Sequence, residues 1–66
     1  MNMIRIKTSL VYDRMDAMML TTADLAEAIG VSIGTMRRIL NLGTCNAITM
    51  GKLAMVLGIK VWEMVA

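Results

Sequence analysis

The segment 21–41 carries two helix-start signals that lie eleven residues apart, and no other feature of the chain constrains its fold as strongly. Thr21 is a favoured N-cap residue, and Asp24 stands at the acidic position of a capping box. Leu20 and Leu25 flank that start at the spacing of a hydrophobic staple. We therefore predict a helix over about residues 22–29.

The second helix start repeats this pattern at Ser32, with Val31 and Met36 at the staple positions. Gly30 lies where the first helix must end, at a position that favours a residue able to adopt positive φ. Because the connection is so short, the two helices must cross sharply. The sequence therefore predicts a helix-turn-helix whose second helix covers about residues 33–41.

Each of these helices has one apolar side, formed by Leu25, Ala26 and Ile29 in the first and by Met36, Ile39 and Leu40 in the second. When the second apolar side faces inward, the outward side presents a bare backbone, two guanidinium groups and a carboxamide. Arginine contacts both guanine edges and phosphate, so this surface suits a polyanion. The residues on it are Gly34, Arg37, Arg38 and Asn41.

Length and composition exclude several classes of protein. Sixty-six residues predict one domain, and seven basic against five acidic residues give a weakly positive balance. The chain has no histidine and one cysteine, Cys45, so we predict no intrachain disulfide, no metal site, no cofactor and no catalytic activity. A lone cysteine fits a reducing cytoplasm.

The hydrophobic content of 58% does not predict a membrane protein. The longest charge-free stretch, 39–51, is shorter than the roughly 18 apolar residues of a spanning helix. The N-terminus shows no signal peptide, so we expect a soluble, cytoplasmic domain. The apolar surplus favours a surface that a partner buries.

The segments before this helix-turn-helix predict an arm and a helix. Residues 1–7 alternate with period two and predict an extended N-terminal arm, either paired as a strand, for instance with a second copy, or loosely held. Residues 8–19 predict a helix capped by Thr8 or Ser9. Its apolar side would hold Leu10, Val11, Met15, Met18 and Met19, with Asp13, Arg14 and Asp16 in water, and Tyr12 would pack with its hydroxyl at the surface.

The segments after it predict a turn over 42–46, a helix capped by Asn46 and a last short helix over 60–65. The helix would end at Gly58 and bury Met50, Leu53, Ala54 and Leu57. Gly51 inside it costs roughly 1 kcal/mol against alanine, which a close neighbouring helix would explain. Trp62 would either cover the core or form a dimer contact.

From about Leu20 to Val65 the chain resembles the phage-repressor-like helix-turn-helix family, also called Cro-type or XRE-type regulators. The resemblance rests on the order of the elements and on the motif Leu-Ala-Glu-x-Ile-Gly-Val-Ser at residues 25–32. Further matches follow at Met36, Ile39, Leu53-Ala54, Leu57-Gly58-Ile59 and Glu63-Met64. The resemblance implies an all-α fold, a compact four- to five-helix bundle with a lambda-repressor-like helix-turn-helix, in one domain over residues 1–66.

The resemblance also implies binding to double-stranded DNA, with the third helix in the major groove. The matching base-contacting positions are Ser32, Ile33, Gly34, Arg37 and Arg38, and the phosphate-contacting positions are Thr22, Thr35, Asn41, Thr44 and Asn46. The chain departs from the family at Ile33 and Gly34, where long polar side chains are common, and at Thr22, which replaces a frequent glutamine. Direct base contacts would then depend largely on the two arginines, or sequence preference on DNA shape.

These features predict a transcriptional regulator of phage or prophage type, a repressor that binds its operator as a homodimer. Half-sites would lie about 10 bp apart or at multiples of that spacing. The alternative is a protein-interaction module on the same fold, such as an antirepressor or accessory protein, which Ile33, Gly34 and the apolar surplus favour. No small-molecule ligand is apparent from the sequence.

Overall fold

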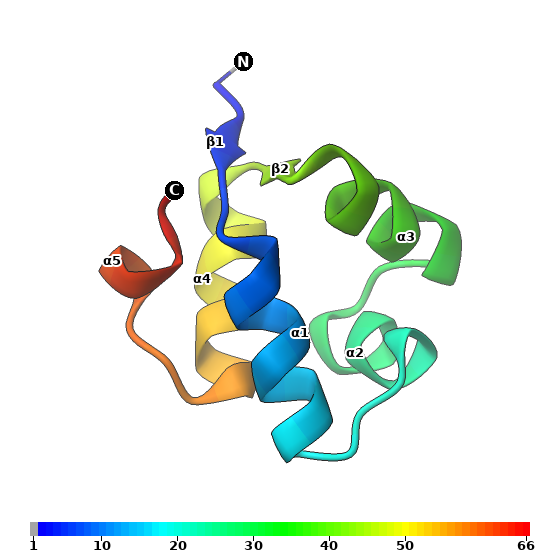
Figure 1. Cartoon of the computed structure of the whole chain (residues 1–66). Coiled ribbons are helices and arrows are strands. Elements are labelled where there is room, and N and C mark those ends of the chain that lie inside the picture. Colours follow the sequence, from blue (N-terminus) through cyan, green and yellow to red (C-terminus); the bar gives the residue numbers. More distant parts are fainter. Residues whose placement is uncertain (1) are drawn as a thin grey trace.

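The computed structural model describes residues 2–66, which fold into five helices and a two-stranded sheet (Figure 1). The predicted all-α class and the number of helices are confirmed. The strands contribute only two residues each. In chain order the elements are β1 (Ile4–Arg5), α1 (Thr8–Ala17), α2 (Thr22–Ile29), α3 (Ile33–Leu42), β2 (Thr44–Cys45), α4 (Ala47–Leu57) and α5 (Val61–Met64).

The two predicted helix starts in the middle of the chain are confirmed. Thr21 and Asp24 form a reciprocal capping box, with N···O distances of 2.9 and 3.0 Å. Ser32 accepts a hydrogen bond from the backbone N–H of Thr35, and Gly30 ends α2 with a φ of 80°. Asn46 caps α4 as predicted, since its Oδ1 accepts from the N–H of Thr49 at 2.8 Å.

The N-terminal arm pairs within its own chain. Ile4 lies opposite Cys45 and Arg5 opposite Thr44 in an antiparallel ladder, and the N–H of Ala66 donates to the Arg5 carbonyl at 2.9 Å. The expectation that this segment pairs as a strand is confirmed at Ile4 and Arg5, but the partner is β2 of the same chain and not a second copy. The alternative of a loosely held arm is wrong for these two residues, and residue 1 lies outside the described range. The segment 42–46, predicted as a turn, contains the strand β2. Burial of Cys45 and Ile6 stabilises the pairing of this strand with β1.

Helix α1 differs from its prediction at both ends. Its N-cap is Lys7, which makes no side-chain capping bond, instead of Thr8 or Ser9. The helix stops at Ala17 because Met19 adopts a φ of 57°, and both Met18 and Met19 are exposed instead of packed.

Arg14 on α1 was predicted to lie in water, but it is half-buried. Its Nε donates a hydrogen bond of 2.9 Å to the carbonyl of Leu57, the last residue of α4. A cation at that end of a helix also interacts favourably with the helix dipole. Arg14 therefore ties α1 to α4.

The core lies between α1, α2, α3 and α4, and Met64 closes it from α5. The predicted buried residues of α4 are confirmed. A Cβ built on Gly51 would meet nothing within 4 Å, so the expected close approach of a neighbouring helix does not occur within residues 2–66. Trp62 is 72% exposed and does not cover the core. Within the described residues, no helix has the length and apolarity needed to cross a membrane.

Candidate nucleic-acid interface

Helix α3 is held in one orientation by its apolar side. Met36, Ile39 and Leu40 are buried against the rest of the core, and α3 packs against α2 across the turn at Gly30. This arrangement fixes which residues of α3 face solvent. The predicted outward residues are indeed exposed, namely Gly34, Arg37, Arg38 and Asn41.

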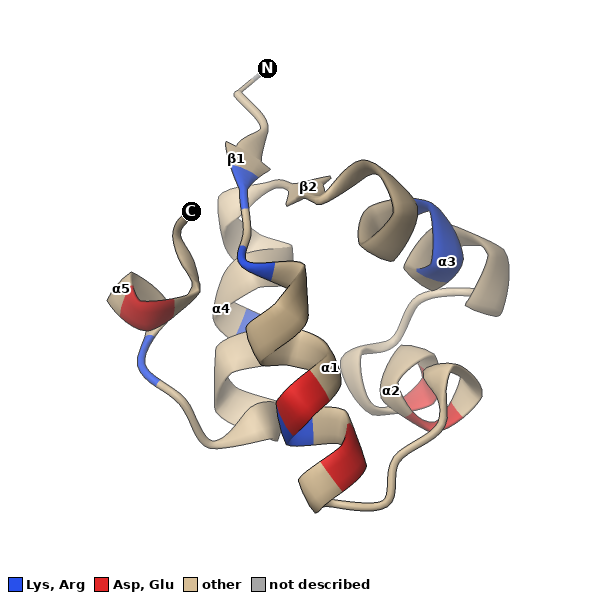
Figure 2. Ribbon diagram, in the orientation of Figure 1, with Lys and Arg blue, Asp and Glu red and all other residues tan. Residues whose placement is uncertain are grey.

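The charges of the molecule are segregated around this helix. Figure 2 shows the acidic residues on α1, α2 and α5, whereas α3 carries only basic ones. No aspartate or glutamate occurs between Glu27 and Glu63, a stretch that includes all of α3, β2 and α4. Positive potential from Arg37 and Arg38 is therefore not cancelled by acids on the same element or on the two that follow it.

The first turn of α3 uses part of its hydrogen-bonding capacity internally. The Ser32 hydroxyl accepts from the N–H of Thr35 and donates to the Thr35 hydroxyl oxygen, at 3.1 and 2.9 Å. Ser32 thus acts first as a helix cap. Since the Thr35 hydroxyl is an acceptor in this pair, its own hydrogen is free to point toward an external acceptor.

The neighbouring positions Ile33 and Gly34 offer contact without hydrogen bonding by side chains. Ile33 is 39% exposed and presents part of its aliphatic surface. A Cβ on Gly34 would meet only the Ser32 hydroxyl, at 4.0 Å, so the backbone there is open to a close approach from outside.

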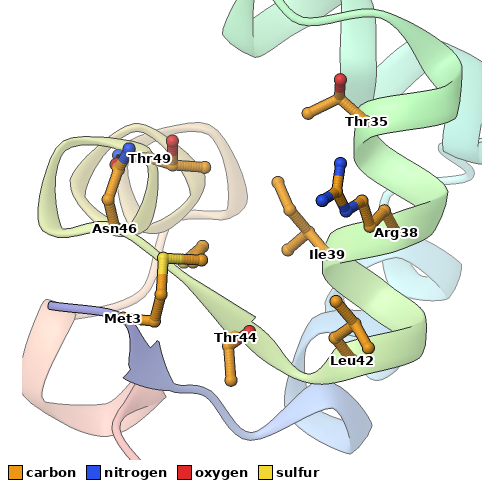
Figure 3. Close-up of a pocket in the computed structure, with 9 residues that line it drawn as sticks. Met3, Thr35, Arg38, Ile39, Leu42, Thr44, Asn46 and Thr49 are labelled. Atoms are coloured by element: carbon orange, nitrogen blue, oxygen red, sulfur yellow. Dashed lines mark hydrogen bonds between the residues drawn. The ribbon is translucent and has the colours of Figure 1, made fainter. Parts of the chain in front are cut away.

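The two arginines of α3 occupy different places. Successive residues of a helix are rotated by about 100°, so their side chains diverge. Arg38 extends toward a pocket between α3 and the start of α4, as Figure 3 shows, and Arg37 does not line that pocket. The guanidinium group of Arg38 therefore lies on the side of α3 next to the pocket, and that of Arg37 lies outside the pocket.

This pocket brings together four of the predicted site residues and adds several that sequence reasoning missed. Its volume is ≈ 240 Å³, and its floor includes buried Cys45. Met3 reaches it only because β1 pairs with β2, and no local sequence pattern predicts that pairing. The lining residues are Met3, Thr35, Arg38, Ile39, Leu42, Thr44, Cys45, Asn46 and Thr49 (Figure 3).

Of the predicted phosphate contacts, Thr22 and Asn41 do not line the pocket. Thr22 is half-buried in the first turn of α2, while Asn41 is exposed near the end of α3. Thr44 and Asn46 line the pocket, but Asn46 already uses Oδ1 to cap α4, which leaves its NH₂ group for an external partner.

Two titratable groups within residues 2–66 have shifted pKa values. Hydrogen bonds from the backbone and side chain of Thr21 lower the pKa of Asp24, which fits its role in the cap of α2. Burial raises the pKa of the Cys45 thiol, so the thiol stays protonated and unreactive near neutral pH. Residues 2–66 contain no group of three or more histidine, cysteine or acidic side chains placed to hold a metal ion.

Comparison with known proteins supports the fold and leaves the function open. No protein-family model and no curated protein matches the chain. Solved structures of native PhpD with cadmium and of a mutant hydroxyethylphosphonate dioxygenase share its fold, at TM-scores of 0.75 and 0.76 and 24% sequence identity. Each match covers 96% of this chain and 14% of the other. The chain thus corresponds to a small part of those larger proteins.

Proposed function

We propose that this domain binds double-stranded DNA through α3 and acts as a transcriptional regulator, specifically a repressor that occupies its operator as a homodimer in the cytoplasm. The observation that carries the proposal is the exposed side of α3. It combines two arginines, an asparagine and a bare glycine on a helix that the turn at Gly30 and its buried side hold in place. The proposal assigns no catalytic role to the domain.

The chemistry of α3 supports different roles for its polar groups. Arg37 has the reach and the donor geometry to contact the O6 and N7 atoms of guanine in a major groove. Arg38 and the Thr35 hydroxyl lie on the side of α3 that faces the start of α4, where they suit a backbone phosphate. The open backbone at Gly34 permits the helix to lie deep in the groove, and Ile33 suits a thymine methyl group.

A homodimer follows from the small number of these groups. One copy offers only two arginines as long hydrogen-bond donors on α3, which limits both affinity and sequence preference. Two copies on a palindromic site double the contacts, with half-sites about 10 bp apart or at multiples of that spacing. Bound in this way, the repressor would act by blocking access of polymerase to the operator.

The test is binding of the purified protein to mixed duplexes of about 20–30 bp at two salt concentrations, where phosphate contacts make affinity fall with salt. Arg37→Ala should cost about 1–3 kcal/mol and relax preference at one base position. Arg38→Ala should weaken binding to all sequences alike and reduce the salt slope by about one. Lys52→Ala, which removes one exposed charge from α4, is the matched control and should change little. Unchanged affinity in the double variant Arg37→Ala/Arg38→Ala would reject α3 as the docking face.

The alternative function is a protein-interaction module, such as an antirepressor or accessory protein. The observation that favours it is the set of large apolar side chains at the surface, including Ile48, Met55 and Trp62, which are 72–82% exposed. Well-folded protein that fails to bind DNA even at low salt would favour this alternative.

A further inference from the structure

The pocket between α3, β2 and α4 has a composition that DNA binding does not explain. Its floor is apolar and closed, since Cys45 is 1% and Ile39 8% exposed. Met3, which precedes β1, and Leu42 from α3 form further apolar lining, and both are more than half exposed. Figure 3 shows Met3, Ile39 and Leu42 around a space that Arg38 enters from α3.

Among residues 2–66, Arg38 is the only charged residue that lines the pocket. No acidic side chain lies on α3, β2 or α4 to pair with it. Hydroxyl groups of Thr35 and Thr49 also line the pocket and supply uncharged donors. Apolar lining combined with one cation and several hydroxyls suits a small organic anion.

The volume and the apolar lining select the class of ligand. At ≈ 240 Å³ the pocket lies below the range of about 300–1,000 Å³ that holds drug-sized molecules, so the ligand must be small. A phosphate group of DNA would pair with Arg38 but would leave Met3, Ile39 and Leu42 uncovered. A short hydrocarbon chain or ring that ends in a carboxylate would both cover these residues and neutralise Arg38.

We infer that this pocket binds a small amphiphilic carboxylate, with the carboxylate on Arg38 and the hydrocarbon part against Met3, Ile39 and Leu42. The pocket holds this ligand whether or not the domain binds DNA. A second consequence rests on the proposed function. Because Arg38 would serve both partners, an occupied pocket withdraws Arg38 from the DNA backbone, and the ligand acts as an inducer that releases the repressor.

The binding test uses three probes that separate charge from hydrophobicity, namely hexanoate, 1-hexanol and inorganic phosphate. Backbone amide shifts of Thr35, Cys45 and Thr49 are followed by NMR at pH 7 as each probe is added. Hexanoate should give saturable shifts at these amides and bind at least about tenfold more tightly than either of the other probes, because only hexanoate satisfies both parts of the pocket.

Variants locate the two interactions. Arg38→Gln should reduce the affinity for hexanoate to that for 1-hexanol, and Leu42→Asn should weaken hexanoate severalfold while the fold persists, since Leu42 is 66% exposed. Arg37→Gln is the matched control because it removes the same charge from the same helix outside the pocket. It should leave hexanoate binding unchanged.

Four results would overturn the inference. They are the lack of saturable hexanoate shifts at the pocket amides, equal affinity for 1-hexanol, equal affinity for phosphate, and an equal loss in Arg37→Gln and Arg38→Gln. Equal affinity for phosphate would instead make the pocket a subsite for the DNA backbone. In a separate titration, saturating hexanoate should lower DNA affinity of the unmodified protein and leave that of Arg38→Gln unchanged. If no DNA binds at all while hexanoate does, the proposed function fails and the pocket assignment stands.

Discussion

Replacing Gly51 by alanine should stabilise the domain, although the position lies inside a helix of a tightly packed bundle. Gly51 is the fifth residue of α4, and a Cβ built there meets no atom within 4 Å. Alanine therefore fits without strain. It removes the helix-propensity penalty of glycine, about 1 kcal/mol, which arises from the greater freedom of glycine in the unfolded chain.

For a domain of this size a gain of about 1 kcal/mol corresponds to a rise of roughly 4–8 °C in Tm. Thermal and urea unfolding followed by circular dichroism measure the change. Gly58→Ala is the matched control, because Gly58 has a φ of 68° and ends α4. It should destabilise the domain by about 1 kcal/mol or more. A lower Tm for Gly51→Ala would refute the reasoning, and a loss that depends on protein concentration would show that a second copy packs against α4.

Three further predictions concern the connections between helices. Met19→Gly should stabilise the domain by up to about 1 kcal/mol in urea unfolding, because Met19 has a φ of 57° and its side chain is 89% exposed, so little packing is lost. The control is Met55→Gly at an exposed position inside α4, which should destabilise the domain by a similar amount. Arg14→Met keeps the aliphatic stem but removes the bond to the Leu57 carbonyl, and should cost about 1 kcal/mol, whereas Arg37→Met on exposed α3 should change stability by less than about 0.5 kcal/mol. The pKa of Asp24 is lowered in the folded state, so its contribution to stability is complete above its ordinary pKa of 3.8 and is lost as pH falls through the folded pKa. The stability of Asp24→Asn should therefore depend less on pH in that range than the stability of the unmodified protein. An identical pH dependence in the two proteins would show that the Asp24 carboxylate does not stabilise the folded state through the capping box.

The parts of the fold that depend on neighbours in sequence were predictable. The caps at Thr21, Ser32 and Asn46 each act on a backbone N–H three residues later, so residue type and spacing are enough to place them. The same holds for the buried side of each central helix, because periodicity alone determines which residues share a side.

The parts that depend on distant segments were not predictable. The bond from Arg14 to Leu57 joins residues 43 positions apart, and the sequence around Arg14 is compatible with a solvated helix face. Pairing of Ile4 and Arg5 with Thr44 and Cys45 also joins distant segments. The alternation over residues 1–7 predicted a strand-like arm, but β2 has only two residues, too few to mark it in the sequence as the partner. The end of α1 was missed for another reason. Met19 adopts a left-handed backbone conformation that usually requires glycine, so the sequence contains no glycine to mark the end of the helix.

The candidate site likewise has features that follow from local sequence and features that depend on distant segments. Exposure of Arg37, Arg38 and Asn41 follows from the periodicity of α3 alone, and the sequence predicted it. The separation of the two arginines between an open helix face and a pocket does not follow from periodicity, because the pocket exists only where β1 brings Met3 beside α3 and α4. Sequence reasoning therefore assigned one role to two residues whose surroundings differ.

The fold alone does not indicate DNA binding, because the buried residues and the exposed residues of the bundle have different roles. Buried residues such as Leu25, Met36 and Leu53 serve the packing of this bundle, and a similar bundle occurs within the much larger PhpD. The proposed regulator requires in addition an exposed basic helix. Helix α3 carries two arginines and no acidic residue, and the nearest acids in the sequence are Asp24 and Glu27 on α2, which packs against it. Loss of DNA binding on introducing an acid on α3, as in Asn41→Asp, with unfolding unchanged, would show that the charge of α3 and not the fold carries the activity. Asparagine and aspartate have nearly the same shape, so repulsion from phosphate is the main property that the exchange adds.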